Sequence, residues 1–238
     1  MSDTEDEATP GDDGSVEVDL ALRAVSALFP TELAAALLPA GTVIAKPTWV
    51  ETQVALQERR LDRLLAVDVS NRRRWLHVEW MLAWTGDLPY RVWEYHNLAA
   101  TAAMNEARSH LKLAREKDRK ARLAVPTVES TVVLLTGRDA PWESEYVHRT
   151  SPEDRPFAGV TFRVEAVYQR TLADLRARGP LWLVFAPVAT DASEEALRGV
   201  VEELRGALEL RAFADLTAAM VVVADADHRH RGLRPSIV

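Results

Sequence analysis

Two apolar segments joined by Ser70-Asn71 have the pattern of a β-hairpin. The arms, residues 58–68 and 73–81, are rich in apolar and strand-forming side chains, and a Ser-Asn pair is typical of turns. A turn centred on Ser70-Asn71 makes the numbers of opposed residues sum to 141. One face of this hairpin is mostly apolar and is expected to lie on the core: Leu61, Leu65, Val67, Leu76, Val78 and Trp80, with Arg63 and Arg74.

The other face of the hairpin carries two carboxylates. Asp62 and Glu79 are opposed in this register, and like charges directly opposite one another are destabilising. A Mg²⁺ ion bound by both groups is one way to stabilise them. The alternatives are a shifted register and two solvated side chains. Asp68 opposes Arg73, and this favourable pair supports the register.

Periodic apolar residues elsewhere predict an α/β fold. It is expected to have a mixed central sheet flanked by helices and a helical C-terminal extension. The segments expected before this extension are helices over residues 20–28, 31–38 and 87–122 and strands over 49–56 and 131–135. The densely charged end of the long helix is either solvated or a patch that contacts phosphates.

The C-terminal extension is expected to be mostly helical. The expected segments are a long loop over residues 138–160, a helix over 162–178, a short apolar stretch over 182–185, and a helix from Asp191 or Ser193 to about Leu208. Four polar side chains near the end of the chain are interpreted as a polar tail: Asp225, Asp227, His228 and His230.

Three short motifs in the N-terminal half occur in a recognisable order. They are Glu58-Arg59-Arg60-Leu61-Asp62, Leu76-His77-Val78-Glu79-Trp80 and Leu88-Pro89-Tyr90-Arg91-Val92-Trp93-Glu94-Tyr95. This series resembles the recombination-promoting nuclease/transposase-like family of the PD-(D/E)XK nuclease superfamily. The piece from Phe162 to Val188 resembles the family's C-terminal half, so the resemblance covers about residues 18–215.

The resemblance implies a restriction-endonuclease-like core, with DNA as the partner and metal-assisted phosphodiester hydrolysis as the activity. Asp62 matches the metal-binding aspartate, and Glu79 matches the acidic residue of the Glu-x-Lys or Glu-x-Gln element. Met81 stands where the family has Lys or Gln, and a thioether carries no positive charge and donates no proton. Two alternatives follow from Met81. Arg60, opposite Met81 in the hairpin, supplies the missing positive charge, or the active site is degenerate. A catalytically inactive protein that binds nucleic acid or protein is therefore the alternative function.

Three other residues near these motifs are candidates for structural roles. Arg91 and Glu94 lie where the family keeps Arg and Glu-Tyr, and they either fix the helix onto the sheet or face the site. His77 shares the face of Glu79, so it either supports that carboxylate or is a packing residue; a lone histidine on a strand is more often a packing residue than a ligand.

The charge of the chain is unevenly distributed. The net charge is -7, but residues 1–19 hold eight acids and no Lys or Arg, whereas residues 57–122 hold 14 bases and nine acids. We therefore expect an acidic, disordered tail over residues 1–16, a nuclease-like core over 17–137 and the extension over 138–238. The chain has no cysteine and no apolar signal segment, which fits a cytoplasmic protein.

Overall fold

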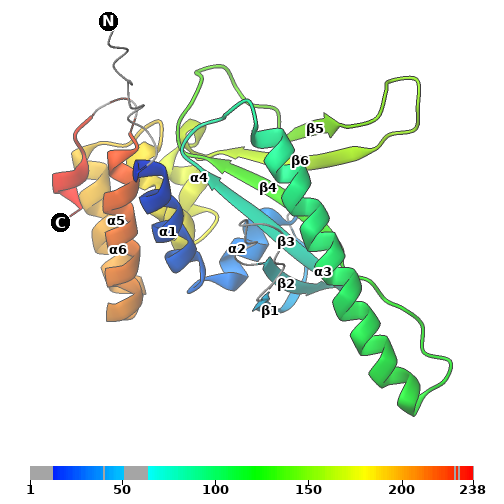
Figure 1. Ribbon diagram of the computed structural model, residues 1–238. Helices are drawn as coiled ribbons and strands as arrows, with labels where there is room; N and C mark the ends of the chain where they lie inside the picture. The colour runs from blue at the N-terminus through cyan, green and yellow to red at the C-terminus, as the bar shows by residue number, and fades with distance from the viewer. Residues whose placement is uncertain (1–12, 40, 51–63, 228, 230, 238) are drawn as a thin grey trace, which may run out of the picture.

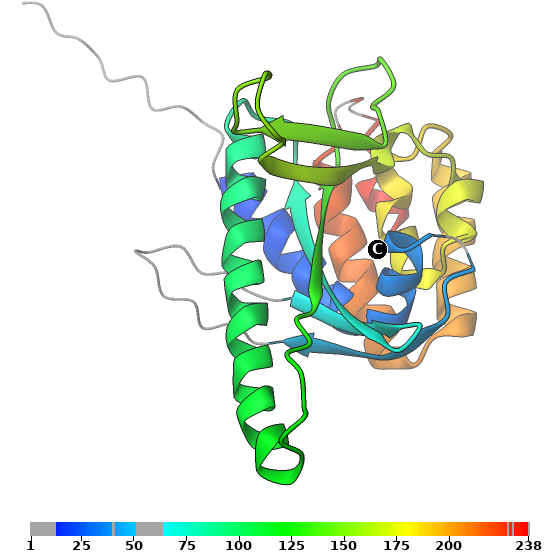
Figure 2. The ribbon, with the colours of Figure 1, turned by 90° about the vertical axis from the view of Figure 1, so that its right-hand side faces the viewer.

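The chain folds into an α/β structure with a mixed central sheet flanked by helices. The computed structural model describes residues 13–39, 41–50, 64–227, 229 and 231–237, and within them the sheet has six strands in the order β1-β2-β3-β4-β6-β5 (Figures 1 and 2). The strands are β1 (Ile44–Val50), β2 (Leu64–Val69), β3 (Arg72–Met81), β4 (Thr127–Leu134), β5 (Glu145–Arg149) and β6 (Gly159–Ala166). The helices are α1 (Asp13–Ser26), α2 (Pro30–Leu37), α3 (Leu88–Lys117), α4 (Leu172–Arg176), α5 (Glu194–Ala207) and α6 (Leu210–Asp225), with 3₁₀ helices η1 (Val167–Gln169), η2 (Pro180–Val188) and η3 (Arg234–Ser236).

The predicted hairpin is present as β2 and β3, and its register is confirmed from residue 65 to residue 76. The sequence numbers of opposed residues sum to 141, and Asp68 faces Arg73 with an Oδ2–Nη1 distance of 3.4 Å. Ser70 and Asn71 both have positive φ, 49° and 63°, as a two-residue turn that matches the strand twist requires. The predicted partners Asp62 and Arg60 lie outside the described residues, as does most of the strand expected over 49–56.

A helical crossover joins the hairpin to the next strand of the sheet. β3 and β4 are parallel, and α3 connects them along one face of the sheet (Figure 2). This face is apolar at the base of the hairpin, where Leu64, Ala66 and Trp75 pack on Ala99 and Ala103 of α3. Both faces of the hairpin are therefore buried, because α3 covers the face that also carries Glu79.

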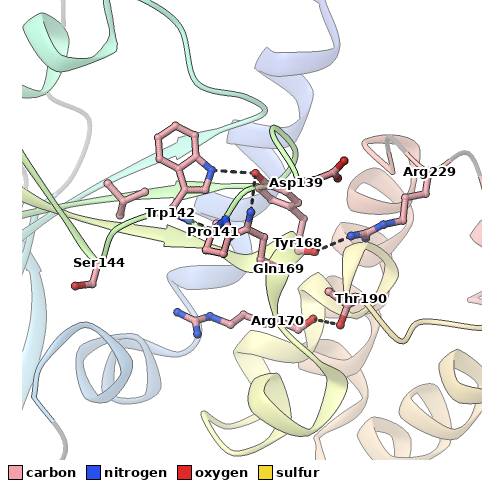
Figure 3. A pocket seen from close by; sticks show the side chains of 11 residues that line it. Asp139, Pro141, Trp142, Ser144, Tyr168, Gln169, Arg170, Thr190 and Arg229 are labelled. Carbon is pink, nitrogen blue, oxygen red and sulfur yellow. Dashed lines mark hydrogen bonds between the residues drawn. The ribbon is translucent and has the colours of Figure 1, made fainter.

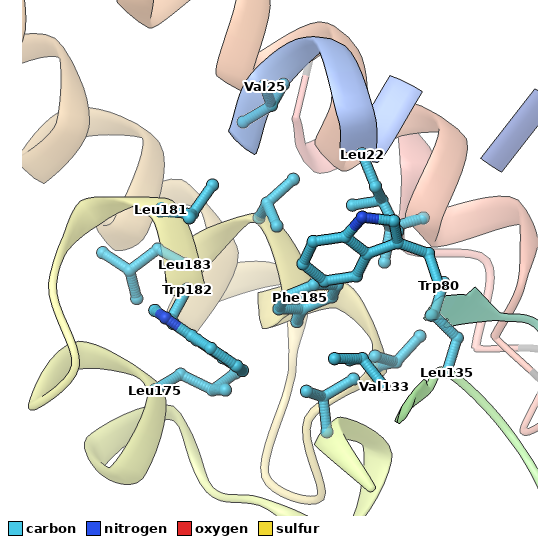
Figure 4. Packing of buried hydrophobic residues seen from close by; sticks show 14 of the residues in the cluster. Leu22, Val25, Trp80, Val133, Leu135, Leu175, Leu181, Trp182, Leu183 and Phe185 are labelled. Atoms are coloured by element: carbon cyan, nitrogen blue, oxygen red, sulfur yellow. The ribbon is translucent and has the colours of Figure 1, made fainter. Parts of the chain in front are cut away.

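The main core lies on the opposite face of the sheet. Trp80 of β3 and Val133 of β4 project from this face toward η2 and toward Leu22 of α1 (Figure 4). The ring centroids of Trp80 and Phe185 are 5.9 Å apart, and those of Phe185 and Trp182 are 5.6 Å apart. The short apolar stretch that the sequence showed near residue 182 is therefore a fully buried 3₁₀ helix.

The prediction for residues 138–178 was wrong in two places. Residues 145–149 form β5, and residues 162–166 belong to β6, so two strands of the sheet come from the segment after residue 137. In β6, Val160, Phe162 and Val164 are buried while Thr161 between them is exposed, which is the two-residue period of a strand. The predicted helix is reduced to η1 and α4.

The interpretation of the C-terminus as a polar tail was also wrong for Asp227. Its side chain is buried and pairs with Arg231 at 3.0 Å, and Leu233 and Ile237 that follow are buried in the core. Guanidinium donors of Arg231 also bind the backbone carbonyls of Pro187, Ala189 and Ala192, which fixes the segment onto the end of η2. His228 and His230 lie outside the described residues.

The predicted helices near residues 20, 31, 87 and 193 are present. They are α1, α2, α3 and α5, and Ser193 caps α5 by accepting a hydrogen bond from the backbone N–H of Ala196. The expected disordered tail was wrong for residues 13–16, which form the first turn of α1. Of the helices that the structure describes, no single one is long and apolar enough to cross a membrane.

Candidate functional site

Glu79 lies near the end of β3, buried under the first turns of α3. Its Oε1 atom is 3.0 Å from Nε2 of His77, and its Oε2 atom is 3.5 Å from Nη2 of Arg91. The same guanidinium nitrogen of Arg91 lies 3.5 Å from the sulfur of Met81. A carboxylate with 9 % exposure is thus held between an imidazole and a cation that reaches it from the neighbouring helix.

A chain of hydrogen bonds continues from Glu79 across the sheet. His77 and Ser130 are register partners on the parallel strands β3 and β4, and Nδ1 of His77 lies 3.1 Å from the Ser130 hydroxyl. Nδ1 of His96, from α3, lies 3.0 Å from the same hydroxyl. Because an ionised carboxylate is an acceptor, we assign the proton of the neutral His77 ring to Nε2, which donates a hydrogen bond to Glu79. His77 Nδ1 then accepts from Ser130, whose oxygen accepts from His96.

Burial of this network changes the pKa of one of its members, His96. Burial lowers the pKa of His96, and the nearby His77 lowers it further. The rings of Tyr95 and His77 pack nearly perpendicular to one another, with centroids 5.9 Å apart. His77 is therefore fixed both by its ring contact and by hydrogen bonds at both nitrogens.

A second carboxylate, Asp19 of α1, lies close to Glu79. Asp19 pairs with Arg23 at 2.6 Å, one helical turn away. Burial raises the pKa of Asp19, Arg23 opposes this shift, and the charges of Glu79 and Arg91 raise and lower it respectively. Two carboxylates and two guanidinium groups thus share one part of the molecule, with no net charge among these four.

The structure brings together some of the residues that the sequence predicted for the site. Glu79 and Met81 both contact Arg91, so of its two expected roles Arg91 has the one that faces the site. His77, expected to be a packing residue, bonds directly to Glu79. The other predicted site residues, Asp62 and Arg60, lie outside the described part of the chain.

Three residues of this cluster were missed by the sequence analysis: Asp19, His96 and Ser130. Ser130 meets His77 through the pairing of strands 53 residues apart, so no local motif reveals it. Among the residues with described positions, no group of three or more His, Asp or Glu side chains is arranged to hold a metal ion.

A separate cavity of about 390 Å³ lies beside the end of β6 (Figure 3). Its polar side chains are largely bonded to one another or to backbone. Trp142 Nε1 donates to the Tyr168 hydroxyl at 2.9 Å, and Gln169 donates to the carbonyls of Arg138 and Ala140, both at 3.0 Å. These bonds fix the segment after β4 onto η1, which is a structural role. The Glu79 cluster therefore remains the candidate site.

Comparison with protein-family models, curated proteins and solved structures gave no match to the chain.

Proposed function

We propose that the chain is a PD-(D/E)XK-type DNA endonuclease-like protein that uses Asp62 and Glu79 to hold Mg²⁺. The observation that carries this proposal is the hairpin register over residues 65–76, because the same register, continued along both strands, opposes these two carboxylates. Glu79 itself lies at the end of a sheet strand, beside a cation and under a helix. Asp62 enters the proposal from the sequence register and the family resemblance.

The chemistry of Glu79 fits a magnesium ligand. Mg²⁺ prefers carboxylate oxygens, and a carboxylate has about four lone-pair directions. His77 takes one direction at Oε1, and Arg91 approaches Oε2 at 3.5 Å, so room for a further partner remains in this count. When bound, the metal would lower the pKa of a coordinated water and stabilise charge on the phosphate.

Arg91 supplies the positive charge that Met81 does not. Its guanidinium lies 3.5 Å from the Met81 sulfur, beside the position where the family has Lys or Gln. An arginine remains protonated in proteins, so its role is to stabilise negative charge on a phosphate rather than to transfer a proton. His77 and Ser130 would hold the Glu79 carboxylate in one orientation.

The second candidate function is a catalytically inactive nuclease-like protein that binds nucleic acid. Two observations favour it: Met81 replaces the expected Lys or Gln, and both oxygens of Glu79 already have protein partners. This candidate predicts DNA binding without cleavage.

A plasmid-nicking assay with and without Mg²⁺ tests the proposal. We expect Mg²⁺-dependent nicking to be lost in Asp62→Ala and in Glu79→Gln, and to be retained in the control Glu202→Gln, an exposed position on α5. Mg²⁺ binding, measured by calorimetry, should weaken in the first two variants. Nicking that persists in both would refute the assignment, and DNA and metal binding without any nicking would favour the second candidate.

A further inference from the structure

The C-terminal end of α3 extends beyond the sheet. The last buried residue of this helix is Ala107, and ten residues follow it to the helix end at Lys117. At 1.5 Å per residue this segment is about 15 Å long. Figures 1 and 2 show it projecting past the strands, with the chain returning beside it toward β4. We call residues 108–122 the projection.

The projection is strongly basic. It contains seven bases and two acids, a net charge of +5. The bases whose side chains are described are all exposed: Arg108, Lys112, Arg115, Arg119, Lys120 and Arg122. The arginines on two other surface helices, α5 and α6, differ in having acidic partners. Arg198, Arg205 and Arg211 each lie within 4.0 Å of a carboxylate.

Three of these bases are aligned on one side of the helix. Arg108, Lys112 and Arg115 have the spacing i, i+4, i+7, and within the described residues none of them has an ion-pair partner. Like charges at this spacing destabilise a helix by a few tenths of a kcal/mol per pair. A polyanion would remove this repulsion. The rise along the axis between successive bases is about 4.5–6 Å, which is comparable with the few-ångström spacing of phosphates along a duplex.

We propose that the projection binds the phosphate backbone of duplex DNA. This proposal rests on the proposed function, which supplies DNA as the partner, and it adds a surface separate from the Glu79 cluster. The projection contains no Phe, Tyr or Trp, so it lacks the large aromatic side chains on which single-strand-binding proteins stack successive bases. Contacts from Lys and Arg to phosphates position a duplex without reading its sequence.

The acidic N-terminal segment of the chain is a less suitable occupant. The helix that follows this segment, α1, packs against α6 and the end of β3. In Figure 1, α1 lies on the far side of the molecule from the projection. DNA has no such restriction, because a duplex presents phosphates along its whole length.

The projection is remote from the candidate active site. Arg91, which contacts Glu79, lies 17 residues before Arg108 on the same helix, a distance of about 26 Å along its axis. Its bases therefore contribute to DNA affinity and leave the chemistry at Glu79 unchanged. This separation means that the projection can fail to bind DNA while the proposed function of the Glu79 site still stands.

The test compares two triple variants of the full chain. Arg108→Gln/Lys112→Gln/Arg115→Gln removes the aligned bases, and Arg198→Gln/Arg205→Gln/Arg211→Gln removes the same charge from α5 and α6. Gln is a good helix former, so helix content by circular dichroism should be unchanged. The dissociation constant for a fluorescein-labelled duplex of about two helical turns is measured by anisotropy in EDTA, between about 50 and 200 mM salt.

We expect the projection variant to bind the duplex on the order of 100-fold more weakly at about 0.1 M salt. The slope of log K against log[salt] should fall by about 2–3, since each phosphate contact contributes about 0.9. The control variant should keep the parental slope. If the projection variant fails to fold, Arg119→Gln/Lys120→Gln/Arg122→Gln, which lies beyond the helix, is measured in the same way.

Unchanged affinity and slope in the projection variant, with a parent that binds the duplex, would overturn this inference and leave the proposed function standing. A parent that fails to bind duplex DNA at low salt would overturn both. Tighter binding of the parent to phosphatidylserine vesicles than to the duplex would also overturn the assignment of DNA as the occupant.

Discussion

Removing the Ser130 hydroxyl tests whether the hydrogen-bond chain beside Glu79 stabilises the fold. Ser130 is 3 % exposed and stands between the imidazoles of His77 and His96, 3.1 Å and 3.0 Å away. Ser130→Ala deletes a single oxygen and keeps the strand backbone. The variant leaves Nδ1 of His77 without its hydrogen-bond partner, in a residue that is itself 3 % exposed.

The expected cost follows from the burial of each imidazole. An unsatisfied buried polar group costs about 1–3 kcal/mol. His77 bears this cost in full, whereas the half-buried His96 can bind water instead. We therefore expect Ser130→Ala to lower the free energy of unfolding by about 2 kcal/mol. For a chain of this size, such a loss lowers Tm by about 4–8 °C.

Urea denaturation followed by tryptophan fluorescence measures this change, with thermal unfolding as a second readout. The matched control is Ser109→Ala on the exposed side of α3, where the hydroxyl bonds to the Asn105 carbonyl at 3.1 Å. This control should stay within about 0.5 kcal/mol of the parent. Equal stability of both variants would refute the reasoning, because it would mean that the chain of hydrogen bonds contributes nothing measurable.

Three further predictions concern the site, the N-terminus and the C-terminal ion pair. Met81→Lys should raise Mg²⁺-dependent plasmid nicking by about 10²–10³, and Arg91→Gln should abolish any native nicking; robust native nicking that neither change affects would place position 81 outside the chemistry. Deleting residues 1–12 removes five acids and should strengthen DNA binding at low salt by reducing repulsion between the chain and the phosphates, with the difference disappearing as salt rises; equal binding by both forms at low salt would show that the charge of this segment does not affect DNA binding. Although burial opposes ionisation, hydrogen bonds from Arg231 hold the pKa of Asp227 below its ordinary value, so this pair contributes stability above about pH 4 that is lost as pH falls through the lowered pKa. Asp227→Ala should cost about 3–5 kcal/mol in urea denaturation at neutral pH and progressively less below about pH 4, and a cost independent of pH would contradict the ion pair.

The hairpin could be predicted from the sequence because its information is local. Ser70 and Asn71 are common turn residues, Asn71 is of a type that tolerates positive φ, and the favourable pair of Asp68 and Arg73 selects the same register. The burial of both hairpin faces could not be predicted in this way. It depends on α3 returning over Trp75, which is a consequence of the crossover to β4.

The hydrogen-bond network of Glu79 was also only partly predictable from local sequence. His77 is two residues from Glu79 and could be recognised as sharing its face, whereas Ser130 reaches it only through the parallel pairing of β3 with β4. Likewise, β6 was mistaken for a helix because its strand character depends on the neighbours β4 and β5 that bury alternate side chains. Non-local pairing carries this information, and a single sequence does not display it.

The same non-local contacts change the interpretation of Met81. From the hairpin alone, the nearest source of positive charge was Arg60 on the opposite strand. The structure places the Arg91 guanidinium 3.5 Å from both the Met81 sulfur and Glu79, so a cation reaches this position from α3. A guanidinium can stabilise charge on a phosphate, but it cannot give up a proton as a lysine ammonium can. The arrangement therefore supports the electrostatic part of nuclease chemistry without a proton donor at position 81, which is why we expect native cleavage to be weak and the Met81→Lys variant to be more active.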